Sequence, residues 1–127
     1  PGETDAEFEE SRQFIASLPF TYLHVFTYSE RPGTPAAANP SQVPMPVRKE
    51  RNRVLRELAA AANREFRGRM VGKRLSAVTL DREALSGNYL RIALSAPRPA
   101  NQLLELEIGG LTAAGLAEKS LLPVLPC

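Results

Sequence analysis

The sequence predicts an α+β chain with three parts: a helix followed by a strand, a long basic amphipathic helix, and a small antiparallel β-barrel. Three observations lead to this prediction. A capped helical repeat runs directly into a short apolar segment, a second helical repeat spans residues 47–67 without Gly or Pro, and apolar residues alternate with period 2 after Gly68. With 127 residues, 43% of them hydrophobic and 24% charged, the chain lies in the globular range.

The first expected element is a helix over residues 5–18. Thr4 and Glu7 have the Thr-x-x-Glu spacing of a capping box, in which the Thr hydroxyl accepts a hydrogen bond from a helix amide and the Glu side chain reaches back to the cap. Apolar residues then recur every three or four positions until Pro19, which ends the helix.

The second expected element is a strand over residues 22–28. This segment is aromatic and β-branched and nearly apolar on both faces, which is typical of a strand buried on both sides. A helix followed by such a strand is the repeating unit of a parallel α/β fold, and one unit cannot complete that fold alone. Residues 29–46 contain five prolines, so we expect neither a helix nor a central strand to persist through this loop or linker.

The helix expected over residues 47–67 has a packing face and a basic face. Apolar residues from Val47 to Phe66 gather on one arc of the helical wheel. Residues 47–74 hold ten Lys and Arg against three Asp and Glu, an excess that favours a polyanion such as nucleic acid, although aligned cations are also typical of a solvated face. The cations of the basic face are Lys49, Arg53, Arg56, Arg64 and Arg67.

The remainder of the chain predicts a small barrel of short strands. Turn signals at residues 86–88, 97–99 and 109–110 separate the candidate strands. A five-stranded barrel needs one strand more than the pattern provides, so we expect a bent or unassigned strand. The candidate strands are residues 73–80, 88–94, 103–108 and 111–116.

Several function classes have no support in the sequence. The chain has one cysteine, Cys127, and neither a Gly-rich phosphate loop nor a nucleophile elbow, so we assign it no catalytic or metal-binding residue. It has no apolar stretch of bilayer length and no signal sequence, so we expect a cytoplasmic protein that does not enter a membrane. Because it begins at Pro1 without Met, we expect it to be part of a longer protein.

Several motifs, taken in order, carry a resemblance to a known family. The chain resembles the C-terminal part of the radical-SAM methylthiotransferases, and Leu-His-Val-Phe before Tyr-Ser is most similar to the branch that acts on N6-threonylcarbamoyladenosine in tRNA. The later motifs resemble the TRAM domain that closes those enzymes. The motifs are Pro1-Gly2-Glu3-Thr4, Leu23-His24-Val25-Phe26-Thr27-Tyr28-Ser29, Arg31-Pro32-Gly33-Thr34-Pro35-Ala36-Ala37, Gln42-Val43-Pro44, Lys49-Glu50-Arg51, Val71-Gly72-Lys73 and Gly87-Asn88-Tyr89-Leu90-Arg91.

The resemblance implies a division of the chain and a role for each part. Residues 1–46 correspond to the end of the split (β/α) barrel of the catalytic domain, residues 47–68 to a connecting helix, and residues 69–127 to an OB-like TRAM barrel that grips tRNA. The parent enzyme is expected to use S-adenosylmethionine and two 4Fe-4S clusters. Because the Cys-x-x-x-Cys-x-x-Cys segment is missing, the fragment alone is expected to be inactive, to bind no cofactor and to pair with the N-terminal part of its enzyme.

The resemblance also points to cofactor-binding and substrate-binding residues in the N-terminal part. His24 and Phe26 are expected to line the adenosyl pocket of the complete enzyme, although a lone His among apolar neighbours is more often a hydrogen-bonded core residue. Arg31 is expected to contact an RNA phosphate, whereas Arg31-Pro32-Gly33-Thr34-Pro35 also suits a simple rigid turn.

The expected RNA face of the barrel pairs cations with one aromatic residue. Barrels of this kind bind nucleic acid through a cationic groove and aromatic platforms, and Tyr89 suits either that face or the core. The alternative function is a free-standing RNA-binding TRAM-type module without catalysis, and residues 1–37 argue against it because a simple binding module does not need them. Without barrel neighbours, residues 1–28 are expected to self-associate. The residues expected on the barrel's RNA face are Lys73, Arg74, Arg82, Tyr89 and Arg91.

Overall fold

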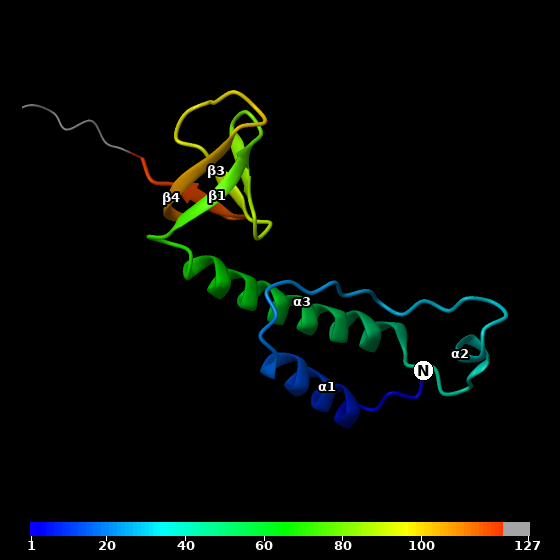
Figure 1. Ribbon diagram of the computed structural model, residues 1–127. Coiled ribbons are helices and arrows are strands. Elements are labelled where there is room, and N and C mark those ends of the chain that lie inside the picture. Colours follow the sequence, from blue (N-terminus) through cyan, green and yellow to red (C-terminus); the bar gives the residue numbers. More distant parts are fainter. Residues whose placement is uncertain (121–127) are drawn as a thin grey trace, which may run out of the picture. The chain divides into compact units, whose positions relative to one another are not determined.

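The computed structural model describes residues 1–120, and the chain divides into two compact units, Pro1–Asn63 and Arg64–Cys127 (Figure 1). The N-terminal unit contains α1 (Asp5–Ser17), α2 (Pro35–Ala38) and most of α3 (Met45–Gly68). The last turns of α3 belong to the C-terminal unit, which also contains β1 (Arg74–Thr79), β2 (Glu83–Ser86), β3 (Arg91–Ala93), β4 (Leu103–Leu111) and β5 (Leu116–Glu118).

The capping box predicted for α1 is confirmed. Thr4 Oγ1 accepts a hydrogen bond from the Glu7 amide at 3.2 Å, and Glu7 Oε2 accepts one from the Thr4 amide at 2.8 Å. These bonds lower the pKa of Glu7, the bond from the Thr4 amide being the main cause. The helix ends at Ser17, one residue earlier than predicted, because Leu18 adopts an extended conformation before Pro19.

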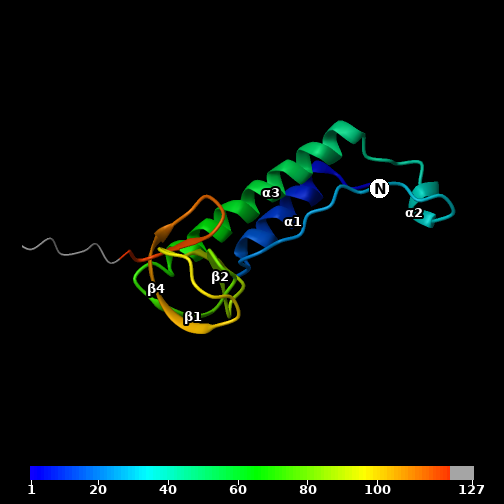
Figure 2. The same ribbon diagram turned by 90° about the horizontal axis from the view of Figure 1, so that it is seen from above.

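The strand predicted over residues 22–28 is not part of any sheet. The segment runs extended beside α1 and α3 without a strand neighbour, as both views show (Figures 1 and 2). It is also not buried on both faces, since Tyr22 and Phe26 are 68% and 85% exposed while Leu23 and Val25 are half-buried. The prediction of a doubly buried strand is therefore wrong for this chain.

Polar side chains of α3 hold this extended segment in place through its carbonyl groups. Asn63 donates to the Thr21 oxygen at 3.0 Å, and Asn52 donates to the Val25 oxygen at 3.4 Å. No residue among positions 1–63 is fully buried, so the unit relies on such bonds and on partly covered apolar side chains rather than on a dry core.

The C-terminal unit is a closed five-stranded barrel in the order β1-β2-β3-β5-β4. Neighbouring strands are antiparallel except β3 and β5, which pair in parallel at Ile92 with Leu116. β5 starts so close to β3 that a Cβ on Gly115 would lie 2.3 Å from the Arg91 carbonyl oxygen, which only glycine avoids. The core contains Met70, Ala77, Ala84, Leu90, Ile92, Leu106, Ile108 and Leu116.

The small barrel was predicted correctly, but it is not wholly antiparallel, because β3 and β5 pair in parallel, and the strand assignments need further corrections. The missing fifth strand is β2, which the sequence pattern did not reveal. β4 continues past Gly109 to Leu111 through a register shift, so the predicted strand over residues 111–116 does not exist as such. The last strand begins at Leu116 instead.

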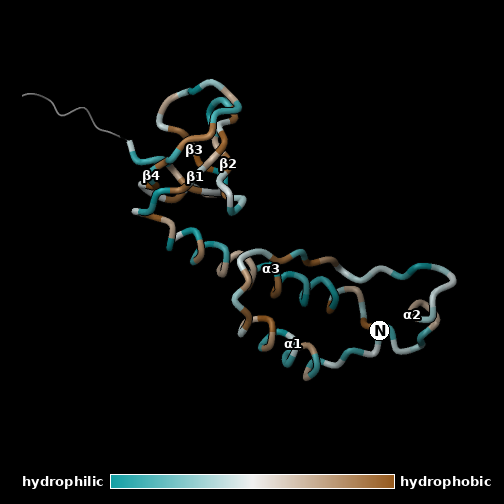
Figure 3. The backbone as a smooth tube through the Cα atoms, viewed as in Figure 1, coloured by the Kyte–Doolittle hydropathy of each residue, from teal (hydrophilic) through white to brown (hydrophobic). Residues whose placement is uncertain are grey.

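The barrel strands and α3 differ in the hydropathy of their residues. In Figure 3, the barrel strands show hydrophobic stretches in brown, whereas much of α3 is hydrophilic. Over residues 1–120, no helix combines the length and the apolar character that crossing a membrane requires.

Candidate nucleic-acid interface

Tyr89 is the most prominent side chain on the barrel surface. It lies in the turn between β2 and β3 and is 85% exposed, so the alternative that it belongs to the core is wrong. Its φ of 63° places it in the left-handed region, where residues with a Cβ are disfavoured. The ring is therefore available to a partner and contributes little to the core.

Ser86 organises the turn that carries Tyr89. The Ser86 side chain is almost completely buried, and its hydroxyl accepts a hydrogen bond from the Leu90 amide at 2.9 Å. The same hydroxyl lies 2.6 Å from Asn88 Oδ1 and 3.1 Å from the Leu90 carbonyl oxygen, the two acceptors for its proton. The Tyr89 amide donates to the Ser86 carbonyl at 2.9 Å, which closes the turn.

The four barrel cations expected to contact RNA are all exposed, and they differ in their pairing. Arg91 forms an ion pair with Glu83 at 2.6 Å on the neighbouring strand. Within residues 1–120, Lys73, Arg74 and Arg82 form no ion pair, although the charge of Arg74 contributes to lowering the pKa of Glu107, for which the hydrogen bond from Lys119 is the main cause.

The cations predicted on the basic face of α3 also fall into two groups. Arg53 lies between two carboxylates, paired with Glu50 at 2.6 Å and with Glu57 one turn further on, and these bonds raise its pKa. Arg56 and Lys49 are exposed and form no ion pair within the described part of the chain, and the same holds for Arg64, which belongs to the C-terminal unit.

Arg67 does not lie on an exposed basic face, which corrects the sequence-based assignment. It is 8% exposed, and its Nη1 lies 3.0 Å from the Thr112 carbonyl oxygen and 3.1 Å from that of Gly115. Its Nε is buried without a hydrogen-bond partner in residues 1–120. Arg67 thus fixes the loop between β4 and β5 within the C-terminal unit.

Two arginines to which the sequence analysis gave no role of their own have structural roles in the N-terminal unit. Arg48 donates to the Val43 carbonyl, pairs with Glu30 at 2.8 Å and lies over the Tyr28 ring. Arg51 pairs with Glu3 at 2.6 Å and lies over the Phe8 ring. The sequence could have indicated that both arginines pack against the rest of the unit, because positions 48 and 51 share a helical face with Leu55 and Leu58.

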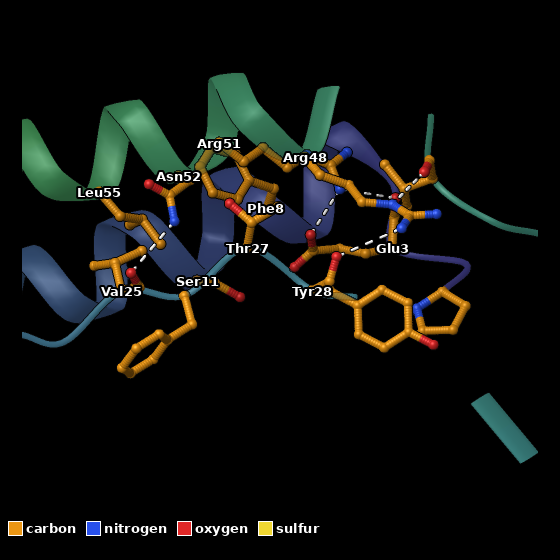
Figure 4. A pocket seen from close by; sticks show the side chains of 13 residues that line it. Glu3, Phe8, Ser11, Val25, Thr27, Tyr28, Arg48, Arg51, Asn52 and Leu55 are labelled. Carbon is orange, nitrogen blue, oxygen red and sulfur yellow. Dashed lines mark hydrogen bonds and ion pairs between the residues drawn. The ribbon is translucent and has the colours of Figure 1, made fainter. Parts of the chain in front are cut away.

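These two arginines border a pocket of about 350 Å³ between α1, the extended segment and α3, shown in Figure 4. The Tyr28 hydroxyl and Arg51 Nε are buried there without a hydrogen-bond partner in the described residues. Phe8, Val25 and Leu55 make the wall largely apolar, so the pocket is an incompletely filled interior as much as a ligand site.

His24 and Phe26, the predicted cofactor-binding residues, lie on the exposed side of the extended segment. Their rings are parallel to within 7° with centroids 6.1 Å apart, and Tyr22 meets His24 edge-on at 4.7 Å. The alternative that His24 is a buried core residue is wrong, because the side chain is exposed. Only Phe26 of the predicted pair borders the pocket.

Arg31 is exposed and forms no ion pair within residues 1–120. Its carbonyl oxygen accepts hydrogen bonds from the Thr34 amide at 3.3 Å and hydroxyl at 2.8 Å, and Gly33 has a φ of 84°. The motif therefore forms the tight turn that its Gly and Pro residues favour, with the Arg31 side chain directed to solvent.

The residues present do not fit an iron–sulfur cluster. Among residues 1–120 no group of three His, Cys, Asp or Glu side chains is close enough to hold a metal ion. Cys127 lies outside the described residues. We therefore assign no step of a reaction to a cluster held by this chain.

The fold defines a class, an OB-like closed β-barrel preceded by a helical unit, and comparisons define the family. No family model matches the chain. A threonylcarbamoyladenosine tRNA methylthiotransferase of Aquifex aeolicus is 32% identical over 109 residues, 85% of this chain and 27% of that protein. The enzyme of the same name from Rickettsia prowazekii is 37% identical over 112 residues, 87% of this chain and 26% of that protein.

A relative with a different name matches a shorter part of the chain at higher identity. A tRNA-2-methylthio-N(6)-dimethylallyladenosine synthase of Coxiella burnetii is 47% identical over 72 residues, 57% of this chain and 16% of that protein. The chain belongs to the methylthiotransferase family that these proteins represent. It spans about a quarter of the length of the first two relatives.

Proposed function

We propose that this chain is the C-terminal part of a tRNA methylthiotransferase and that its barrel, of the TRAM type, contributes tRNA binding. The observation that carries the proposal is the match along 85% and 87% of the chain to proteins named as tRNA methylthiotransferases. The exposed cations of the barrel and the exposed ring of Tyr89 support it, because single-stranded RNA is bound by phosphate contacts together with aromatic stacking.

The chemical step is proposed to belong to other residues of the parent enzyme. The parent would hold the two 4Fe-4S clusters and S-adenosylmethionine that the family resemblance implies, and His24 and Phe26 would line its cofactor pocket. The N-terminal unit has no fully buried residue and an exposed aromatic row, which suits a segment completed by further parts of the catalytic domain in the cytoplasm.

The branch within the family is proposed to be the one that acts on threonylcarbamoyladenosine. The two relatives of that name match the chain over a longer stretch than the dimethylallyladenosine synthase does, although the latter has the higher identity. The alternative function, a free-standing RNA-binding module, is favoured by one observation: the barrel has a core of its own.

Salt-dependent binding of tRNA tests the RNA-binding part of the proposal. Lys73→Gln together with Arg82→Gln should weaken binding to all RNAs alike and reduce the slope of log K against log salt by roughly 0.7–0.9 for each phosphate that the variant no longer binds. Lys119→Gln is the matched control, because Lys119 is exposed but already paired with Glu107 at 2.6 Å. Equal affinities and slopes for wild type and both variants would contradict RNA binding by the barrel.

The chemical part is tested separately by adding the missing domain. When the chain is joined to the upstream part of its own protein, methylthiolation of tRNA should appear, and it should depend on the barrel cations. An upstream part without a cluster motif would instead favour the free-standing module.

A further inference from the structure

The backbone of Tyr89 is unfavourable for the residue that occupies it. Its φ of 63° suits glycine, asparagine or aspartate, and a bulky aromatic residue is uncommon there. Packing of the side chain does not compensate for this conformation, because the Tyr89 side chain is almost fully exposed. Strain retained without a gain in packing is a mark of functional sites.

Several hydrogen bonds of the surrounding turn fix this backbone conformation. The Ser86 hydroxyl binds the Leu90 amide and faces Asn88 Oδ1, and the Ser86 carbonyl accepts the Tyr89 amide. Leu90 is buried in the barrel core directly after the turn, so its position is fixed. Tyr89 is held between two anchored residues and cannot relax toward the barrel wall.

We propose that Ser86 is a positioning residue that holds Tyr89 outward as a preformed platform for one unpaired base of RNA. The inference rests on the proposed RNA-binding function of the barrel and deepens it, because it names the ligand class: RNA with an unstacked base, as in a loop, rather than a continuous duplex. Every base has a π-face to stack on a tyrosine ring, whereas bases inside a duplex are already stacked and paired.

Preorganisation is the physical advantage of the buried serine. A tyrosine on a mobile turn would lose conformational freedom when a base stacks on it, and this loss would weaken binding. In this turn the freedom of the backbone is already lost on folding, because the Ser86 side chain is buried and doubly engaged. Removal of the hydroxyl should therefore weaken stacking without removing any group that touches RNA.

The test compares Ser86→Ala with Ser76→Ala in the full chain. Ser76 undergoes the same chemical change on the exposed face of β1, where its hydroxyl has no hydrogen bond within residues 1–120. The ligands are a stem–loop RNA with an unpaired adenine-rich loop and a fully paired duplex of the same length. Ser86→Ala should bind the stem–loop about fivefold more weakly and the duplex as wild type does, while Ser76→Ala should match wild type on both.

The salt dependence separates positioning from loss of structure. Stacking involves no counterion release, so Ser86→Ala should shift the line of log K against log salt without changing its slope, whereas unfolding of the barrel would flatten it. Asn88→Ala, at an exposed position of the same turn, provides a second variant with less risk to folding and should weaken stem–loop binding in the same direction.

A readout without RNA completes the test. The chain has no tryptophan, so Tyr89→Trp introduces a single tryptophan at the platform, which can be excited selectively at wavelengths that tyrosine does not absorb. Its fluorescence anisotropy decay should show a faster local motion when Ser86→Ala is added and no change when Ser76→Ala is added. If wild type binds the stem–loop but Ser86→Ala binds it equally well, the positioning role is wrong and the RNA-binding function stands. If wild type binds neither RNA, both fail.

Discussion

Arg53 and Arg56 lie three positions apart on α3 and differ in their electrostatic surroundings. Arg53 is shared by the carboxylates of Glu50 and Glu57, whereas Arg56 is exposed and forms no ion pair within residues 1–120. A phosphate that approached Arg53 would have to displace a carboxylate and meet the repulsion of the other. A count of cations in the sequence gives the two residues equal weight, whereas their ion pairing in the structure distinguishes them.

We therefore predict unequal effects of neutralisation on RNA affinity. Arg56→Gln should reduce tRNA affinity and flatten its salt dependence, while Arg53→Gln should change both less, because it removes a charge that is already balanced. Filter binding at several salt concentrations measures both quantities. An equal loss for the two variants would show that the ion pairs of Arg53 open freely when RNA binds.

Arg67 gives a second prediction at the residue scale. Arg67→Ala would remove the Arg67 donor from the Thr112 carbonyl oxygen and one of the two donors to the Gly115 carbonyl oxygen, whose other donor is the Thr112 amide, and it would open a void beside the barrel. The free energy of unfolding should fall by about 2–3 kcal/mol, measured by urea denaturation. Arg69→Ala is the control, since that side chain is exposed and should change stability by less than about 0.5 kcal/mol.

At the scale of elements, the long loop between β3 and β4 is attached to β5 through Glu118. Burial alone raises the pKa of Glu118, but hydrogen bonds from the Ser95 amide and hydroxyl and the Arg98 guanidinium outweigh it, and the pKa lies below its usual range. The Glu118 side chain is 10% exposed, so water competes little for these bonds.

A pH dependence of stability follows from the depressed pKa of Glu118. A carboxylate whose pKa is lowered by folding contributes stability above its unfolded pKa, and this contribution is lost as the pH falls through the folded pKa. Glu118→Gln should therefore lower the free energy of unfolding by about 1 kcal/mol at pH 7, and the difference from wild type should shrink below about pH 4. Thermal denaturation between pH 2 and 8 would measure it, and a difference independent of pH would exclude the carboxylate as its source.

The sequence predicted the helices well and the strands less well, for a reason visible in β1 and β2. The inward residues of β2 are Ala84 and Ser86, and the outward residue Leu85 is larger and more apolar than either. In β1, Ala77 and Thr79 point inward while Val78 is 40% exposed. An alternation of hydrophobicity thus indicated the wrong face or no strand, because β1 and β2 contribute small inward side chains while other strands contribute large ones such as Ile92 and Ile108.

The sequence predicted which residue types form the candidate site, but not the exposure or burial of each side chain. Lys73, Arg74, Arg82 and Arg91 were expected on the RNA face, and all four are exposed, but the exposure of Tyr89 depends on the left-handed turn that Ser86 fixes. Arg67 was assigned to the basic face because a helical wheel assumes one packing side along the whole helix. In the last turn of α3 the packing side changes, since the loop over residues 112–115 covers it.

At the scale of the whole molecule, the two units differ in how completely they cover their apolar surface. The barrel has a closed ring of strands and a buried core, whereas the N-terminal unit exposes the aromatic row Tyr22, His24 and Phe26 beside an extended backbone without a strand neighbour. Such a segment offers unpaired backbone groups and apolar area to another chain.

We predict that the chain self-associates at high concentration through this segment. Tyr22→Ser with Phe26→Ser should reduce association, while Leu103→Ser, which removes an exposed apolar side chain from the barrel, should reduce it less. Light scattering over a range of concentrations measures the effect. A monomer at all concentrations, with the segment ordered, would contradict the prediction.

We expect the long-range strand pairs that close the barrel to limit how fast the chain folds. α1 forms from contacts between near neighbours in the sequence, but the barrel is complete only when Ile92 meets Leu116 and Val78 meets Leu103. Closing such distant pairs costs loop entropy before any stabilisation is gained, so this step is slow compared with helix formation. A newly made chain therefore passes through an interval in which its helices exist and its strand edges are still open. During that interval molecular chaperones have the most to bind, and substitutions that hasten closure would shorten it.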